Sequence, residues 1–252
     1  MKTEPHKEQK AESRRQKWEG EPAALRTPHS ALRTLLGFTL IELLVVVSII
    51  GLLAALTFPA VTRARIAMMR ARAKSELTAL ETVIERYNQK LGVYPPDNAP
   101  YWEAPPLYYE LLGTTNSSGV FHTLDDSAQI AASVLQAAFG PSSTIVGFQN
   151  CSRGGGDGLA GGVAFVKSLK PTQFVAITNA PSPNPVTIMG TSLEGPLVFQ
   201  TGGIKLNPWR YNSSSPRYNP KTFDLWIDVA AGDKTNRICN WSDKPLIVST
   251  PY

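Results

Sequence analysis

Residues 38–61 read FTLIELLVVVSIIGLLAALTFPAV, and this stretch decides how the rest of the chain is organised. It contains 24 residues and a single charged side chain, Glu42. At a rise of ~1.5 Å per residue, a helix of this length spans about 36 Å, which is enough to cross the ~30 Å hydrocarbon core of a bilayer. The sequence therefore predicts a transmembrane helix over residues 38–61.

Glu42 distinguishes between three interpretations of this span. A secretory signal peptide is disfavoured, because the polar leader is long and the apolar stretch exceeds the usual ~7–15 residues. An ionisable side chain inside the bilayer costs about 2.5 kcal/mol or more, so Glu42 needs a partner. An uncleaved anchor offers no partner in the sequence. An anchor cut before Phe38 offers the freed amine of Phe38 on a neighbouring subunit. The remaining alternative is a carboxyl that is protonated or reaches the headgroups.

The run from Gly37 through Phe38 and Glu42 to Val45, GFTLIELLV, resembles the cleavage and methylation motif of type IV pilins and type II secretion pseudopilins. The resemblance continues to Val61. It implies that residues 1–37 are a cytoplasmic leader, that a prepilin peptidase cuts between Gly37 and Phe38, and that the same enzyme methylates the new amine. It also implies that Glu42 neutralises this amine on an adjacent subunit during assembly. A bend is expected at Pro59, since an internal proline removes a helix hydrogen bond.

The charge of the chain is divided unevenly. Its 25 Lys+Arg and 20 Asp+Glu give +5 in total, with +3 in residues 1–37, +4 in residues 38–74 and −2 in the remaining 178 residues. The basic excess thus flanks the apolar span, and the body of the protein is mildly acidic. This distribution disfavours a general nucleic-acid-binding domain, and no nucleic-acid partner is expected.

A second helical pattern follows the span. Apolar residues recur at steps of three or four, at Ile66, Met69, Ala73, Leu77, Leu80, Ile84, Tyr87 and Leu91. Gly92 and Pro95-Pro96 then end the pattern. Residues 62–92 are therefore predicted to continue the helix as an amphipathic element whose apolar stripe packs on a globular domain; a coiled coil is the lesser alternative.

Residues 93–252 have the composition of a domain made mostly of short strands. One more helix is predicted over Ser127–Phe139, with Asp126 or Ser127 as its cap. Strands are predicted over Val163–Lys167, Phe174–Thr178, Val186–Met189, Leu197–Thr201 and Phe223–Val229, with a weaker one over Leu246–Ser249. The expected fold class is α+β and pilin-like, a long N-terminal helix packed on a mainly antiparallel sheet.

Within this domain the sequence is most similar to the G-type major pseudopilins. The similarity rests on Tyr94-Pro95, Pro208-Trp209 with Tyr211, Phe223-Asp224-Leu225 and Asn240-Trp241. Residues 97–207 exceed what a compact member needs and are interpreted as a large insertion of unassigned role. The resemblance also implies calcium bound by Asp228 and Asp233 in the loop after the strand. The neighbouring Lys234 and Arg237 favour the alternative of solvated aspartates, because Ca²⁺ prefers oxygen ligands with little positive charge nearby.

The remaining candidate chemistry is sparse. Two cysteines cannot form a disulfide-rich scaffold or a four-cysteine zinc site, but Cys151 and Cys239 would lie outside the cytoplasm, where a disulfide between them is permitted. His122 is the only histidine after residue 37, and no nucleophile motif accompanies it. We therefore expect no enzymatic activity.

The resemblance implies a structural pseudopilin of a type II secretion system, held in the bacterial inner membrane by one helix, with residues 93–252 in the periplasm. This orientation follows from the motif. The partners implied by the resemblance are a prepilin peptidase and methylase, further copies in a homopolymer, membrane lipid, and an inner-membrane secretion platform with its ATPase. The alternatives are a type IV pilin for adhesion, motility or DNA uptake, and a singly anchored periplasmic binding protein.

Overall fold

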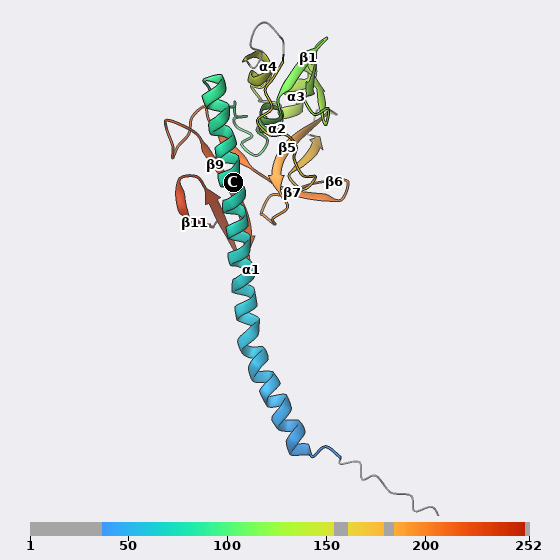
Figure 1. The fold of residues 1–252 in the computed structure, drawn as a ribbon, viewed down its shortest axis with the longest axis vertical. Coiled ribbons are helices and arrows are strands. Elements are labelled where there is room, and N and C mark those ends of the chain that lie inside the picture. Colours follow the sequence, from blue (N-terminus) through green and yellow to red (C-terminus); the bar gives the residue numbers. More distant parts are fainter. Residues whose placement is uncertain (1–36, 154–160, 179–183, 250–252) are drawn as a thin grey trace, which may run out of the picture. The chain divides into compact units, whose positions relative to one another are not determined.

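The structure, a computed structural model, describes residues 37–153, 161–178 and 184–249. The chain divides into two compact units, Met1–Gly51 and Leu52–Tyr252. Helix α1 (Leu40–Leu91) begins in the first unit and continues in the second (Figure 1). The second unit also contains α2 (Leu107–Leu112), β1 (Thr114–Ser117), β2 (Val120–Thr123), β3 (Gln129–Ala131), η1 (Ala132–Val134), α3 (Leu135–Phe139), α4 (Gln149–Arg153), β4 (Phe174–Thr178), β5 (Pro185–Thr191), β6 (Phe199–Thr201), β7 (Ile204–Pro208), β8 (Arg210–Asn212), β9 (Asp224–Ala231), β10 (Lys234–Cys239) and β11 (Ser242–Val248).

The second half of α1 packs on the domain through the predicted apolar stripe. Its buried residues are Ala73, Leu77, Leu80, Ile84 and Tyr87, all of them members of the predicted series. The helix ends at Leu91, and the next residue, Gly92, adopts a φ of +74° and donates its N–H to the carbonyl of Asn88 at 2.8 Å. Glycine tolerates this left-handed conformation, which other residues rarely adopt, so the predicted stop signal acts through backbone geometry.

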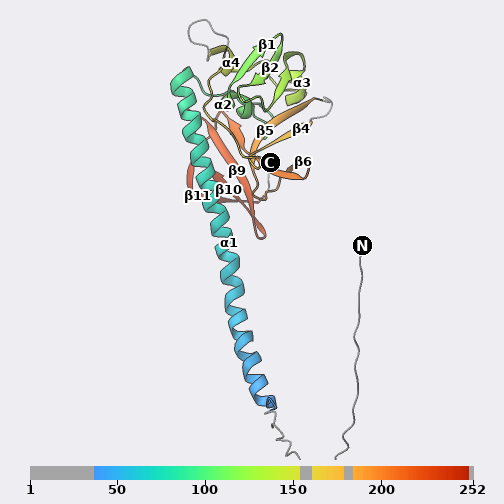
Figure 2. The same ribbon diagram turned by 45° about the vertical axis from the view of Figure 1, so that its right-hand side comes forward.

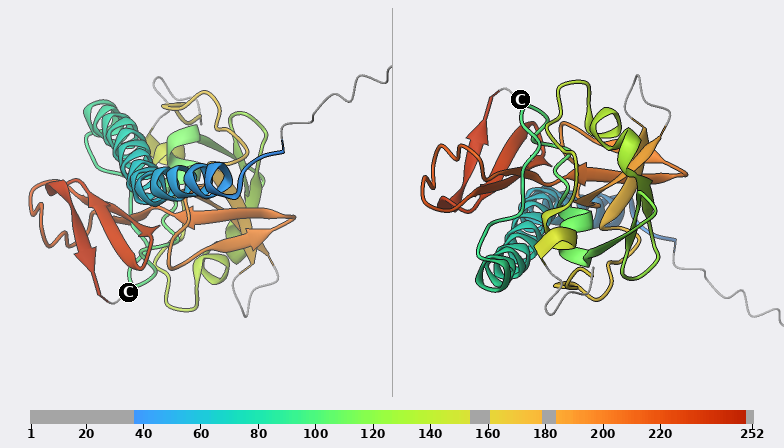
Figure 3. Two further views of the ribbon diagram at one scale, coloured as in Figure 1. Left: turned by 90° about the horizontal axis from the view of Figure 1, so that it is seen from below. Right: turned by 90° about the horizontal axis from the view of Figure 1, so that it is seen from above.

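The strands form antiparallel sheets with the orders β1-β2-β3, β4-β5-β7-β6 and β11-β10-β9-β8. Figure 3 shows the sheet of β8 to β11 and the sheet of β4 to β7 as separate layers. Strands β10 and β11 lie alongside α1 (Figure 2), where Arg70 of the helix donates a hydrogen bond to Asn236 of β10 at 2.9 Å. The observed fold is α+β and pilin-like, as the sequence predicts.

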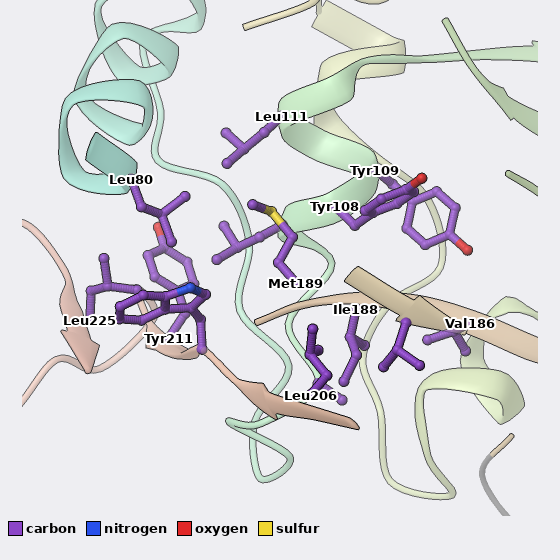
Figure 4. Packing of buried hydrophobic residues seen from close by; sticks show 14 of the residues in the cluster. Leu80, Tyr108, Tyr109, Leu111, Val186, Ile188, Met189, Leu206, Tyr211 and Leu225 are labelled. Atoms are coloured by element: carbon purple, nitrogen blue, oxygen red, sulfur yellow. The ribbon is translucent and has the colours of Figure 1, made fainter. Parts of the chain in front are cut away.

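One hydrophobic core joins α1 to both larger sheets and to α2. Figure 4 shows Leu80 of α1 and Leu225 of β9 in the same cluster as Tyr108 and Tyr109 of α2 and Ile188 of β5. The expected insertion, residues 97–207, supplies a large part of this cluster. Within the described residues, this segment is therefore part of the core of the domain.

The helix predicted over Ser127–Phe139 is wrong for its first half. Residues Gln129–Ala131 form β3 and pair with β2 in the register Phe121↔Ile130, and only Leu135–Phe139 is α-helical. Asp126, the expected cap, has a φ of +55° in the turn between β2 and β3. Pairing with a neighbouring strand thus overrides the local helical preference.

The predicted strand Val163–Lys167 is also wrong, whereas β4 matches its prediction and β5, β6, β9 and β11 overlap theirs. The backbone of this segment bonds to other partners. Val163 donates its N–H to the Asn150 side chain at 2.7 Å, and Phe165 and Val166 donate theirs to the carbonyl of Leu111 at 2.9 and 3.0 Å. These bonds satisfy the backbone without a strand ladder.

Glu110 connects three helices in the interior. Its carboxylate accepts hydrogen bonds from the Tyr87 hydroxyl of α1 at 2.7 Å and from the backbone N–H groups of Gln149 and Asn150 at 2.7 and 2.8 Å. The side chain is fully buried. Burial raises the pKa of the Glu110 carboxyl to about 7, although these hydrogen bonds act to lower it.

The raised pKa predicts that the protein loses stability as the pH rises. The folded state binds the Glu110 proton more tightly than the unfolded state, whose ordinary pKa is 4.5, so the stabilisation is complete below pH 4.5 and is lost as the pH passes through about 7. We expect this group to lower the free energy of unfolding by up to about 3 kcal/mol across that window. Urea denaturation of the full chain in neutral detergent, at a series of pH values, measures this change.

Glu110→Gln should remove that part of the pH dependence, because glutamine does not titrate. The substitution should also lower stability at every pH, since its amide group meets two backbone N–H donors. Asp233→Asn, at an exposed turn position, is the control and should leave the slope unchanged. If the free energy of unfolding depends equally on pH in wild type and Glu110→Gln, Glu110 does not govern this dependence.

Candidate processing and assembly segment

Thr39 and Glu42 cap the N-terminus of α1 through mutual hydrogen bonds. Thr39 precedes the first helical residue, and its N–H and hydroxyl donate to Glu42 Oε2 at 2.8 and 2.6 Å. The Glu42 N–H in turn donates to the Thr39 hydroxyl at 3.2 Å. This is a capping box, in which a threonine and a glutamate three residues later satisfy each other's backbone donors. The residues of the predicted processing motif therefore also define where the helix begins.

The capping box uses only one oxygen of Glu42. Both bonds to the carboxylate end on Oε2, and within the described residues no hydrogen bond reaches Oε1. The adjacent Phe38 is 74% exposed, and no atom within 4 Å surrounds the position that a Cβ on Gly37 would occupy. The peptide bond between Gly37 and Phe38 is thus flanked by open space, and Glu42 keeps an acceptor for a cation from another molecule.

The apolar stretch of α1 is unpartnered. Among the described residues, α1 is the one helix long and apolar enough to cross a membrane, and none of its most apolar window is buried. Its large exposed side chains between residues 38 and 61 are Phe38, Leu40, Ile41, Leu43, Leu44, Val45, Val46, Val47, Ile49, Ile50, Leu52, Leu53, Leu56, Phe58 and Val61. Such a continuous apolar surface is unfavourable in water, so it indicates a lipid or protein environment.

The few polar groups of this stretch bond within the helix. The hydroxyls of Ser48, Thr57 and Thr62 donate to the carbonyls of Leu44, Leu53 and Phe58 at 2.6, 2.8 and 3.1 Å. This arrangement suits a hydrocarbon environment, in which every polar group must be satisfied internally. Pro59 lies inside α1, which continues through it without interruption. The bend expected at Pro59 stays a prediction.

Residues that carry the resemblance in the globular domain lie together in space. The Tyr211 hydroxyl donates to the Pro95 carbonyl at 3.1 Å, and the Phe223 ring lies 5.2 Å from Tyr94 and 5.5 Å from Tyr211. Asn240 accepts the Leu225 N–H at 3.0 Å and donates to the Phe223 carbonyl at 2.8 Å. These residues connect the segment after α1 to strands β8 and β9 and the turn after β10.

The two expected calcium ligands are not arranged as a cation site. Asp228 is fully buried, and its Oδ1 and Oδ2 accept hydrogen bonds from Nε–H and Nη2–H of Arg237 at 2.8 and 2.9 Å. Asp233 lies apart, in the exposed turn between β9 and β10, and within the described ranges no group of three or more His, Cys, Asp or Glu side chains could hold a metal. Arginine already neutralises Asp228, so these residues do not fit calcium.

The two cysteines are free thiols, each with its own surroundings. Cys151 lies in α4 near Thr114 and Asn116, and Cys239 is buried in β10 near Trp241 and Lys74. Burial raises the pKa of both thiols, which disfavours the reactive thiolate. The disulfide that the sequence permits between them is not formed in the structure.

Sequence reasoning missed two polar groupings. Glu110 sits inside the apolar run LYYELL, and a charged residue in such a run is a signal for a buried network. A small pocket between α1 and β11 is lined by Arg70 and Lys74 of the helix and by Lys244, which is 170 residues further along the sequence. Arg70 and Lys74 were recognisable as a basic stretch, but nothing in the sequence brings Lys244 to them.

The Asp228–Arg237 pair predicts a large stability effect and insensitivity to calcium. Arg237→Met leaves a buried carboxylate without its partner, so we expect the free energy of unfolding to fall by about 3–5 kcal/mol. Lys234→Met, at the exposed start of the same strand, is the matched control and should change it little. Thermal unfolding of the wild type should be the same with calcium or with a chelator. A calcium-dependent rise that Asp228→Asn abolishes would contradict this account.

Comparison with known proteins gives one match. The family described as the prokaryotic N-terminal methylation motif matches residues 36–58. No curated protein and no solved structure matches the chain. The matched residues include the predicted cleavage position, the capping box with Glu42, and most of the apolar stretch. This motif, together with the long apolar helix and the antiparallel sheets, supports a type IV pilin-like or pseudopilin protein.

Proposed function

We propose that this protein is a structural pseudopilin of a type II secretion system. In this proposal a prepilin peptidase removes residues 1–37 and methylates Phe38, and α1 holds the mature protein in the inner membrane with its domain in the periplasm. Copies then assemble through the apolar stretch into a short filament that moves cargo outward. A partner ATPase supplies the energy.

The main support for the proposal is the hydrogen bonding of Glu42, which lies at the start of an unpartnered apolar helix. One carboxylate oxygen accepts the capping hydrogen bonds at the start of the helix, and the other has no hydrogen bond within the described residues. A carboxylate in an apolar span needs a positive partner, and the amine of Phe38 created by cleavage on a neighbouring copy supplies it. Ser48, Gly51, Ala54 and Ala55 are small residues that permit close approach of neighbouring helices.

The choice of a secretion pseudopilin over a pilus subunit rests on the globular domain. The residues that resemble G-type pseudopilins, Tyr94, Tyr211, Phe223 and Asn240, pack together as one cluster. The mildly acidic domain also argues against DNA uptake. No catalytic role is proposed, since neither the sequence nor the described residues contain a recognisable set of catalytic side chains.

The proposal predicts that the charge of Glu42 is required for assembly. Glu42→Gln removes the partner of a buried amine, which costs about 3–5 kcal/mol, and should reduce filament formation more than tenfold in cells that contain the secretion machinery. Chemical crosslinking of the membrane fraction, followed by counting of oligomers, measures assembly. Membrane insertion of the variant should be unchanged.

Thr39→Val is the matched control. It removes the hydroxyl of the capping box but keeps the carboxylate, so assembly should be largely retained even though the first turn is weakened.

Deletion of the protein should abolish protein secretion and spare surface pili. Loss of pili with normal secretion would instead identify a pilus subunit, and normal assembly of Glu42→Gln would contradict both filament functions.

A further inference from the structure

A small pocket lies between α1 and the C-terminal hairpin, where β10 and β11 run beside the helix (Figure 2). Its volume is about 180 Å³, room for about six waters at ~30 Å³ each and therefore for one phosphate group. We call it the basic pocket. It is lined by Arg70, Ala71, Lys74, Ile238, Ser242, Asp243, Lys244 and Pro245.

The cations of the basic pocket have unused donors. Arg70 gives one N–H to Asn236 at 2.9 Å, while its Nε is buried and has no acceptor. Lys74 makes two long bonds of 3.4 Å to the carbonyls of Cys239 and Ser242. Within the described part of the chain, neither these residues nor Lys244 form an ion pair within 4.0 Å, although Asp243 lines the same pocket. The lining residues contain three cations and one carboxylate, a formal net charge of +2, and Glu81 of α1 also interacts electrostatically with Lys74.

This combination favours a ligand with several anionic oxygens. Arginine presents a planar set of donors that matches phosphate, and lysine adds a compact charge on a flexible stem. A single carboxylate would occupy fewer of these donors. Hydrogen bonds between such ionised groups are also about twice as strong as neutral ones.

The position of the basic pocket indicates where the phosphate comes from. Arg70 follows Val61, the end of the apolar stretch, by nine residues, or about 13 Å along the helix, and helical side chains tilt back toward the N-terminus. Exposed Arg63 and Arg65 lie between the two. The β9–β10 turn also approaches this part of α1, since a Cβ on Gly232 would lie 3.9 Å from Ile66. The helical residues that line the pocket are therefore within about four turns of the proposed membrane-spanning stretch.

We propose that the basic pocket binds the phosphate of an anionic phospholipid headgroup through Arg70, Lys74 and Lys244. The choice of lipid as the source rests on the membrane anchoring of the proposed function. The binding of phosphate itself does not rest on it. A bound headgroup bridges α1 and β11 and thereby stabilises the contact between the helix and the C-terminal hairpin.

The test is the thermal stability of the full chain in neutral detergent, with phosphatidylglycerol, phosphatidylcholine or inorganic phosphate added at constant ionic strength. A ligand that binds only the folded state raises the unfolding midpoint. We expect phosphatidylglycerol to raise it at much lower concentration than inorganic phosphate, and phosphatidylcholine to have no effect. Lys244→Gln should weaken the effect of phosphatidylglycerol about tenfold, the loss of one charge-assisted contact.

Lys90→Gln is the control, because Lys90 is exposed in the last turn of α1 and outside the pocket. Lys244 is itself exposed on an edge strand, so its substitution should not prevent folding.

Equal shifts of the unfolding midpoint by phosphatidylglycerol in wild type and Lys244→Gln would overturn the proposal. Inorganic phosphate acting as well as the lipid would overturn the lipid as the source. Loss of filament assembly in Lys244→Gln without any ligand effect would show that the pocket is a protein contact instead. Because the measurement uses isolated protein, a failure of filament assembly as a function leaves its result unaffected.

Discussion

Burial of one apolar stripe on α1 is the interaction on which the domain depends. Leu77, Ile84 and Tyr87 are completely buried, and through them the helix meets α2 and the sheets in a single core. The second half of α1 is amphipathic, whereas the first half is apolar on every side. Exposure of the apolar first half to water is unfavourable. The same helix therefore requires two environments, the folded domain for its second half and an apolar environment for its first half.

At the N-terminus of α1, two polar side chains cap the helix. Thr39 and Glu42 close the first turn of the helix, and the same carboxylate keeps an oxygen for a charge from outside. Capping alone would be served as well by glutamine, which also occurs at this position of a capping box. A charged residue in an otherwise apolar span is costly, and a cation from a neighbouring molecule offsets this cost. The free oxygen of Glu42 is therefore consistent with the proposed processing and assembly, in which the amine of Phe38 on a neighbouring copy supplies the cation.

Local patterns predicted much of the fold and the processing motif, and long-range contacts explain what they missed. The steps of three and four residues in α1 identified the buried stripe, because they reflect the geometry of one helix. The pairing of Phe121 with Ile130 turned an expected helix into a strand, and the pairing of β9 with β10 placed Arg237 on Asp228, where a calcium ligand was expected. The basic pocket depends on Arg70 and Lys244 meeting across the fold, which no local pattern encodes.

The central claim is that residues 1–37 are removed and that the chain begins at a methylated Phe38. The intact mass of the protein extracted from bacterial membranes, beside that of Gly37→Ala, tests it most directly. The account predicts a wild-type mass equal to residues 38–252 plus one methyl group, and a full-length mass for the variant. A wild-type protein that keeps its leader would contradict the account, and α1 would then be an ordinary membrane anchor.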